Sequence, residues 1–183
     1  MNPGRFQVDL SGHRTNAACA GPGAQLLGGG FDGFGKWLPA EDFAALADQI
    51  GGLPGRWGAG GADNVECQGQ QFLVAPPAPV RAVGVVGAGT GGSLRDELTL
   101  LGPEGAREQR VPLALSDFLA GGPAFGEEIA AEADTLRIEG IDIKGPRPKL
   151  WRSRRPLPAP FIVASVRLPF NPGLHVFSLW FEI

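Results

Sequence analysis

The chain has 183 residues, of which 43% are hydrophobic and 19% charged, and its formal net charge is −3. This composition is too apolar for a disordered chain, and it lacks the basic footprint of a nucleic-acid-binding protein. No apolar stretch reaches membrane-spanning length, and residues 1–6 do not have the pattern of a signal peptide. We therefore expect a cytoplasmic protein that binds neither membranes nor nucleic acids.

Glycine and proline are frequent, with 29 and 17 copies, and they are scattered among short apolar runs. Such punctuation requires many turns and favours an all-β sandwich or barrel. No repeat or linker divides the sequence, so we expect a single domain over residues 1–183. The two cysteines, Cys19 and Cys67, are expected to be free thiols, because no secretion signal directs them to an oxidising compartment.

The first elements are a strand, a loop and a helix. Residues 5–11 alternate between apolar and polar side chains, which is typical of a half-buried strand. A glycine-rich loop follows over residues 12–30. Residues 39–50 predict a helix, because Pro39 suits the first helical position and acidic residues in the first turn complement the positive end of the helix.

The remainder of the chain predicts strands separated by turns. The runs that indicate strands are residues 71–74, 80–87, 98–101, 107–113, 135–143, 161–168 and 174–183. Pro103-Glu104-Gly105 is expected to close a hairpin between the third and fourth of these. Residues 145–160 are basic and proline-rich and are expected to form an excursion, that is, a segment that leaves the sheets. The last strand must be received inside a sheet, and residues 5–11 are its expected neighbour.

Four groups of residues occur in an order that is similar to a known family. They are Val8-Asp9-Leu10-Ser11, Phe31-Asp32-Gly33-x-Gly35 with Pro39-Ala40-Glu41, Asp63-Asn64-Val65-x-x-x-Gly69-Gln70, and Val166-x-Leu168-Pro169 with Leu174-His175-Val176-Phe177. Together they resemble the galactose-binding-domain-like β-sandwich modules attached to many bacterial and fungal glycoside hydrolases. The resemblance implies a jelly-roll sandwich whose first and last strands are neighbours, and a non-catalytic role in carbohydrate binding.

A carbohydrate site needs an aromatic plate for the apolar ring face, surrounded by polar groups that bond the hydroxyls. Trp37, Trp57 and Trp151 lie in or beside segments rich in glycine and charge, and Asp32 and Arg56 are the polar candidates. The alternative for each tryptophan is a place in the core. Five basic residues suggest a further alternative, an acidic ligand bound by arginine; these are Arg147, Lys149, Arg152, Arg154 and Arg155.

Two other functions remain open from the sequence. A small enzyme of specialised metabolism, of the cyclase or isomerase type, could use an apolar pocket with Asp32, His13 or Glu41 as its acid or base. An interaction module in a larger complex is the third reading. No metal or cofactor is expected, because no cluster has zinc-ligand spacing; structural calcium at Asp32 is the alternative. The sequence does not fix the oligomeric state.

Overall fold

The computed structural model describes residues 4–22, 28–44, 61–105 and 107–183. Strands dominate this part of the chain, and its one α-helix, α1 (Ala40–Ala44), is short. Two 3-10 turns, Ser11–His13 and Pro103–Gly105, complete the helical content of the described residues. The predicted all-β class with a single short helix is confirmed.

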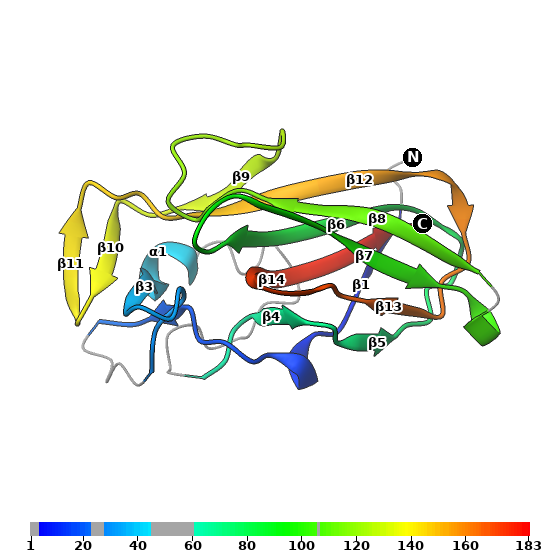
Figure 1. The fold of residues 1–183 in the computed structure, drawn as a ribbon, viewed down its shortest axis with the longest axis horizontal. Helices are drawn as coiled ribbons and strands as arrows, with labels where there is room; N and C mark the ends of the chain where they lie inside the picture. The colour runs from blue at the N-terminus through cyan, green and yellow to red at the C-terminus, as the bar shows by residue number, and fades with distance from the viewer. Residues whose placement is uncertain (1–3, 23–27, 45–60, 106) are drawn as a thin grey trace.

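The described residues form three sheets (Figure 1). Sheet 1 contains, in spatial order, β1 (Arg5–Gln7), β14 (Phe170–Glu182), β6 (Val80–Gly89), β12 (Lys149–Phe161) and β9 (Glu128–Glu132), with β4 (Val65–Gln68) beside the first half of β14. Sheet 2 contains β5 (Gln71–Leu73), β13 (Ser165–Arg167), β7 (Leu94–Leu101) and β8 (Glu108–Leu115). A small sheet contains β11 (Ile141–Lys144), β10 (Thr135–Ile138), β3 (Lys36–Pro39) and β2 (Cys19–Ala20).

Sheets 1 and 2 have the connectivity of a jelly roll. The chain runs from β4 in sheet 1 to β5 in sheet 2, back to β6 in sheet 1, and on to β7 in sheet 2. Strands β7 and β8 then form a hairpin within sheet 2. From β12 to β14 the chain again alternates between the two sheets. The resulting orders are β4-β14-β6-β12 and β5-β13-β7-β8, and all of these pairs are antiparallel. The predicted jelly-roll sandwich is therefore confirmed.

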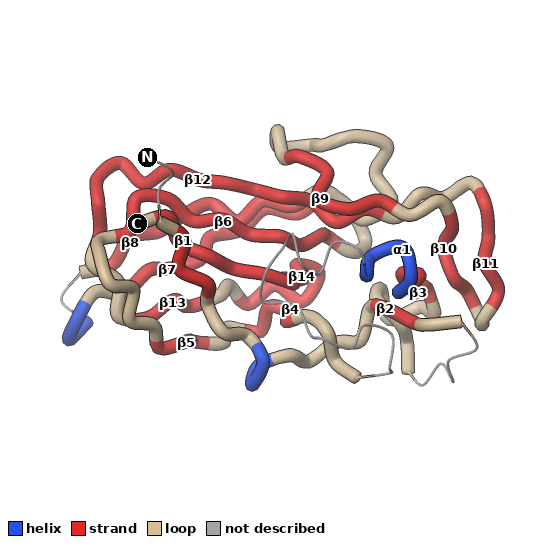
Figure 2. Tube along the Cα trace, turned by 180° about the vertical axis from the view of Figure 1, so that it is seen from behind, coloured by secondary structure: helices blue, strands red, loops and turns tan. Residues whose placement is uncertain are grey.

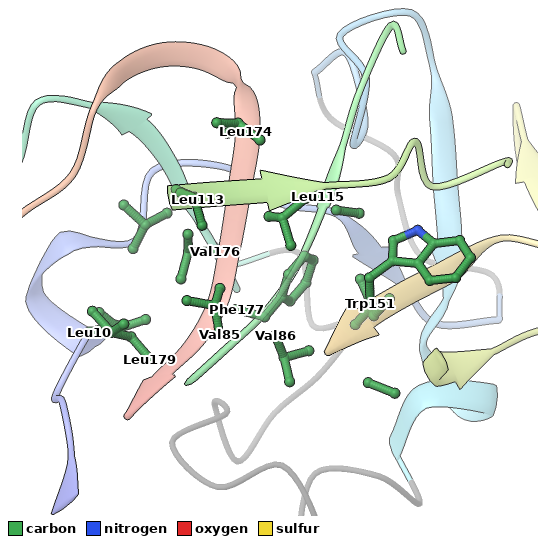
Figure 3. Packing of buried hydrophobic residues seen from close by; sticks show 14 of the residues in the cluster. Leu10, Val85, Val86, Leu113, Leu115, Trp151, Leu174, Val176, Phe177 and Leu179 are labelled. Atoms are coloured by element: carbon green, nitrogen blue, oxygen red, sulfur yellow. The ribbon is translucent and has the colours of Figure 1, made fainter. Parts of the chain in front are cut away.

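The two sheets enclose the hydrophobic core. Strand β8 of sheet 2 packs across β6 and β12 of sheet 1, and side chains from these strands and β14 meet between the layers (Figure 3). Phe177, Leu115 and Val86 are completely buried there. Burial of such side chains stabilises the fold by about 1.5–3 kcal/mol each, before the cost of chain ordering is subtracted.

Strand β14 has neighbours on both of its edges. It pairs with β6 on one side, and with β4 and then β1 on the other. Phe6 and Phe181 are direct partners in the β1–β14 ladder, and their rings stack with centroids 6.2 Å apart. The expectation that residues 5–11 lie beside the last strand is confirmed for residues 5–7, and Val8 still donates its backbone N–H to the Leu179 carbonyl at 2.9 Å. The chain then turns away and forms the 3-10 turn.

Two predicted elements differ from those observed. Residues 135–143 form a hairpin, β10–β11, instead of one strand, because Glu139 and Gly140 both adopt positive φ (51° and 80°), as a two-residue hairpin turn requires. The predicted proline-rich excursion over residues 145–160 is mostly the long strand β12, paired to both β6 and β9. The helix begins at Ala40 and is described as far as Ala44; the rest of the predicted helix lies outside the described residues.

The small sheet stands at the end of the molecule away from the C-terminus, beside α1 (Figures 1 and 2). Arg137 of β10 links these elements: its buried guanidinium forms ion pairs with Glu41 of α1 (2.6 Å) and Asp142 of β11 (2.7 Å), and it donates to the Ala20 carbonyl of β2. Cys19 and Cys67 are buried free thiols, as predicted. No helix in the described part of the chain is long and apolar enough to cross a lipid bilayer.

Candidate functional site

Trp37 and Trp151 lie in the core. Trp37, on β3, is 3% exposed, and Trp151, on β12, is fully buried, with its indole N–H donating to the Asp117 carbonyl at 3.0 Å. Neither ring presents a face to solvent, so neither can serve as the plate of a carbohydrate site. Their neighbouring glycines and charges suggested loops, but both residues are on strands, facing inward. Trp57 and Arg56, the other predicted members of that site, lie outside the described residues.

Glu41 and His13 were candidates for acid–base chemistry, but each makes its contacts elsewhere in the protein. Partial burial opposes ionisation of Glu41, but the hydrogen bonds from Arg137 hold the pKa of its carboxyl below the ordinary value. His13 is exposed on the 3-10 turn and meets the ring of Phe72 edge-on, with centroids 4.5 Å apart. The structure does not place either residue in the pocket that contains Asp32.

That pocket has a volume of about 600 Å³ and lies where several loops converge beside the start of β14. Its walls come from the 31–36 loop before β3, the turn after β6, the segment after β8, and the residues that open β14. The members that matter chemically are Asp32, Phe34, Lys36, Glu66, Thr90 and His175. Of the predicted site residues that the structure describes, Asp32 is the one that lines this pocket.

The Asp32 carboxylate shapes the loop that forms one wall. One of its oxygens accepts the backbone N–H groups of Phe34 (2.9 Å) and Lys36 (3.2 Å), and the other accepts the Lys36 ammonium at 2.6 Å. Aspartate commonly accepts backbone N–H groups of a turn in this way. Burial alone would raise the pKa of Asp32, but these hydrogen bonds outweigh it and hold the pKa below its ordinary value. The group is therefore ionised at neutral pH.

Glycines allow the same loop to fold tightly. Gly30 has a φ of 70°, and a Cβ atom there would stand less than 3.0 Å from the Lys36 carbonyl. Next to it, Phe31 is buried and packs edge-on against Phe118 and His175, with ring centroids 5.1 and 4.7 Å away. The loop is thus fixed to the core through Phe31 and closed on itself through Asp32.

Phe34 is the feature that the sequence analysis missed. Its side chain is 87% exposed on the pocket wall, between Gly33 and Gly35. Large aromatic side chains are normally buried, because exposing 150–250 Å² of ring surface is unfavourable. The sequence does contain a signal, since Phe34 is an aromatic residue directly between two glycines, but the predicted stacking residues were all tryptophans.

His175 forms the buried floor of the pocket. Its Nδ1 lies 2.9 Å from Asn64 Oδ1, and its Nε2 lies 3.2 Å from the Thr90 hydroxyl. The Asn64 amide group donates to Asn16 Oδ1 and Asp63 Oδ1, both at 2.8 Å, which leaves Asn64 Oδ1 as an acceptor. Nδ1 of His175 therefore carries the proton, and Nε2 accepts from Thr90.

Burial lowers the pKa of His175 to about 4, so its ring is neutral at pH 7. Efficient general acids and bases have a pKa near the working pH, and neither His175 nor the ionised Asp32 meets that condition. Both are better suited to hydrogen bonding than to proton transfer. His175 also satisfies both ring nitrogens within the protein.

No protein-family model matches the chain, and no curated protein sequence matches it significantly. The resemblance to galactose-binding-domain-like modules therefore stays a prediction. Within the described residues, no group of three or more histidine, cysteine, aspartate or glutamate side chains is arranged to hold a metal ion.

Proposed function

We propose that the protein is a non-catalytic carbohydrate-binding domain whose ligand occupies the pocket beside Phe34. The observation that carries the proposal is the combination of an exposed aromatic ring with an ion pair and a hydroxyl in the same pocket: Phe34, Asp32–Lys36 and Thr90. A pyranose has an apolar face and a rim of hydroxyl groups, so its binding site needs an aromatic surface beside polar groups.

The polar groups of the pocket offer both kinds of hydrogen bond. Lys36 can donate to a sugar oxygen, while Glu66 and the Asp32 carboxylate can accept from sugar hydroxyls. The loop that carries Asp32, Phe34 and Lys36 is closed by its own hydrogen bonds, so little ordering is needed when a ligand binds. The volume of about 600 Å³ falls in the usual range for small-molecule sites and suits one or two sugar units.

The alternative function, an enzyme that encloses an apolar substrate, has less support. Four charged residues line the pocket, namely Asp32, Lys36, Glu66 and Asp117, and an apolar substrate would displace water from them without offering hydrogen bonds in its place. The proposed function is the one that the resemblance of the sequence to galactose-binding-domain-like modules implies.

A titration of the whole chain with neutral mono- and oligosaccharides tests the proposal. Calorimetry is expected to detect binding of at least one sugar, and NMR signals of Phe34 and Thr90 are expected to shift on its addition. The proposal fails if no sugar of the panel produces heat, or if the shifts lie elsewhere on the protein.

A further inference from the structure

A second cleft, of about 470 Å³, lies on sheet 1 and shares no described residue with the pocket beside Phe34. It is bordered by β1, β9, β12 and β14. The side chains that define it are Arg5, Glu128, Arg152, Arg154, Trp180 and Glu182. Nothing in the proposed carbohydrate site uses any of them.

Strand register places these side chains on one face of the sheet. Gly84 of β6 is opposite Trp180 of β14 on one side and Arg154 of β12 on the other. Residues directly opposite in antiparallel strands point to the same face, as do residues two apart in one strand. Arg5, opposite Glu182, and Arg152, opposite Glu128, therefore join the same face.

Trp180 orients one of the arginines. The indole lies over Gly84, which has no side chain to displace it, and the Arg5 guanidinium carbon is 3.8 Å from the ring centroid. A guanidinium over an indole face is held by cation–π attraction, so Arg5 is positioned in the cleft in advance of any ligand.

The cleft has an excess of positive charge. Arg154 forms a two-point pair with Glu182, with both N–O distances at 2.6 Å. Arg152 is half-buried and has no hydrogen bond or ion pair with any side chain in the described part of the chain. Burial, and next the charge of Arg152, lower the pKa of Arg5, so these two guanidinium groups repel one another. Among the described residues that line the cleft there are three arginines and two glutamates, which gives this lining one net positive charge.

We propose that this cleft is a second binding site, for a ligand that carries a single carboxylate, with Arg152 and Arg5 as the groups that hold it. The planar fork of a guanidinium matches the two oxygens of a carboxylate, and the Arg154–Glu182 pair in the same cleft has this geometry. One carboxylate neutralises the excess charge and removes the repulsion between Arg5 and Arg152. A phosphate dianion carries two negative charges, which is more than the one excess positive charge of the cleft. The assignment is independent of the carbohydrate site.

The test uses the whole ¹⁵N-labelled chain and two sugars that differ in one carboxylate, D-glucuronate and D-glucose, at low salt. Glucuronate is expected to shift the Trp180 indole N–H and the Arg152 Nε–H signals to saturation, whereas glucose leaves them unchanged. Arg152→Gln is expected to raise the dissociation constant at least tenfold, since a hydrogen bond between charged groups is lost. Arg110→Gln removes an exposed arginine on β8, outside the cleft, and is expected to leave the constant unchanged.

The proposal is overturned if glucuronate does not move these two signals, if glucose moves them equally, or if Arg152→Gln binds glucuronate as tightly as the unaltered protein. Inorganic phosphate serves as the dianionic probe, and tighter binding of phosphate than of glucuronate at pH 7.5 would refute the carboxylate assignment. Shifts confined to Phe34 and Thr90 would place glucuronate in the first pocket and would count against the second. The two proposals can therefore fail separately.

Discussion

The indole of Trp180 occupies the space that a Cβ atom on Gly84 would need. An ideal Cβ at position 84 would lie less than 3.0 Å from three atoms of the ring, closer than real Cβ atoms approach other heavy atoms. The two residues are direct partners across the β6–β14 ladder. The sheet can therefore place a tryptophan flat on its surface only because the neighbouring strand has glycine there.

Gly84→Ala is accordingly expected to lower the free energy of unfolding by about 1–3 kcal/mol, because either the rigid ring or the strand must move. Urea unfolding followed by tryptophan fluorescence measures the change. Gly121→Ala is the matched control, since a Cβ at that position meets nothing within 4 Å. Equal stability of the two variants would contradict the packing described for Trp180.

His175 is expected to make stability depend on pH. Its pKa is about 4 in the folded protein against 6.5 for an unperturbed histidine, so between these values the unfolded chain binds a proton that the folded chain does not. The contribution of His175 is complete above pH 6.5, falls as the pH decreases, and is constant below pH 4. Lowering the pH from 7 to 5 should therefore reduce the free energy of unfolding by about 2 kcal/mol through His175.

Urea unfolding at pH 5 and pH 7 measures this effect as a difference between variants. His175→Gln is expected to lose most of the His175 contribution, while His13→Gln, at the exposed histidine, retains it. Burial raises the pKa of Asp63, which opposes the trend, but Asp63 is present in all three proteins and cancels. If the free energy of unfolding of His175→Gln changed between pH 7 and pH 5 as much as that of the unaltered protein, the lowered pKa of His175 would be disproved.

Arg137 is expected to be a main support of the small sheet. Arg137→Met removes two ion pairs and the hydrogen bond to Ala20, and should lower the free energy of unfolding by about 2 kcal/mol. The loss is smaller than for a fully buried pair, because Glu41 and Asp142 are 41% and 44% exposed and can be hydrated.

Arg110→Met is the control for this prediction. Its ion pairs with Glu97 and Glu108 are 3.7 Å long and exposed, so a change below about 0.5 kcal/mol is expected in chemical denaturation. Comparable losses in both variants would show that Arg137 acts as an ordinary surface arginine.

Phe34→Ala is expected to weaken binding of the sugar identified by the panel about tenfold, since stacking and apolar contact are lost together. Thermal unfolding should not change, because the side chain is 87% exposed. Phe170→Ala removes a phenylalanine that is 78% exposed and does not line the pocket, and it should bind the sugar as the unaltered protein does. If calorimetry gives the same affinity for both variants, Phe34 is not the stacking residue.

The sequence predicted those strands that a short local pattern marks. The hairpin around Pro103-Glu104-Gly105 and the last strand were both visible in apolar runs bounded by turn residues. Strand β12 was missed because Pro156 lacks the backbone N–H that a ladder uses, and two further prolines follow it. The β6–β12 pairing accommodates them with a register shift between Pro156 and Phe161.

The candidate site was harder to predict, because it depends on contacts between distant residues. Asp32 could be named as a candidate from the sequence, since an aspartate beside glycine in a turn has a local role. The burial of Trp37 and Trp151 depends on which face of a strand meets the opposite sheet, and the sequence around them does not encode this directly. The exposure of Phe34 likewise depends on how the loop seats Phe31 against Phe118 and His175.

The central position of β14 sets the order in which the sandwich can form. Because β14 follows β1, β4 and β6 in the sequence, the edges of these strands that it covers stay open until β14 has been synthesised. Pairing such as that of Arg5 with Glu182 joins residues that are far apart in the sequence, which gives a high contact order and slow folding. During synthesis, the open edge of β6 is a surface that other nascent chains can pair with, and a chaperone would protect it.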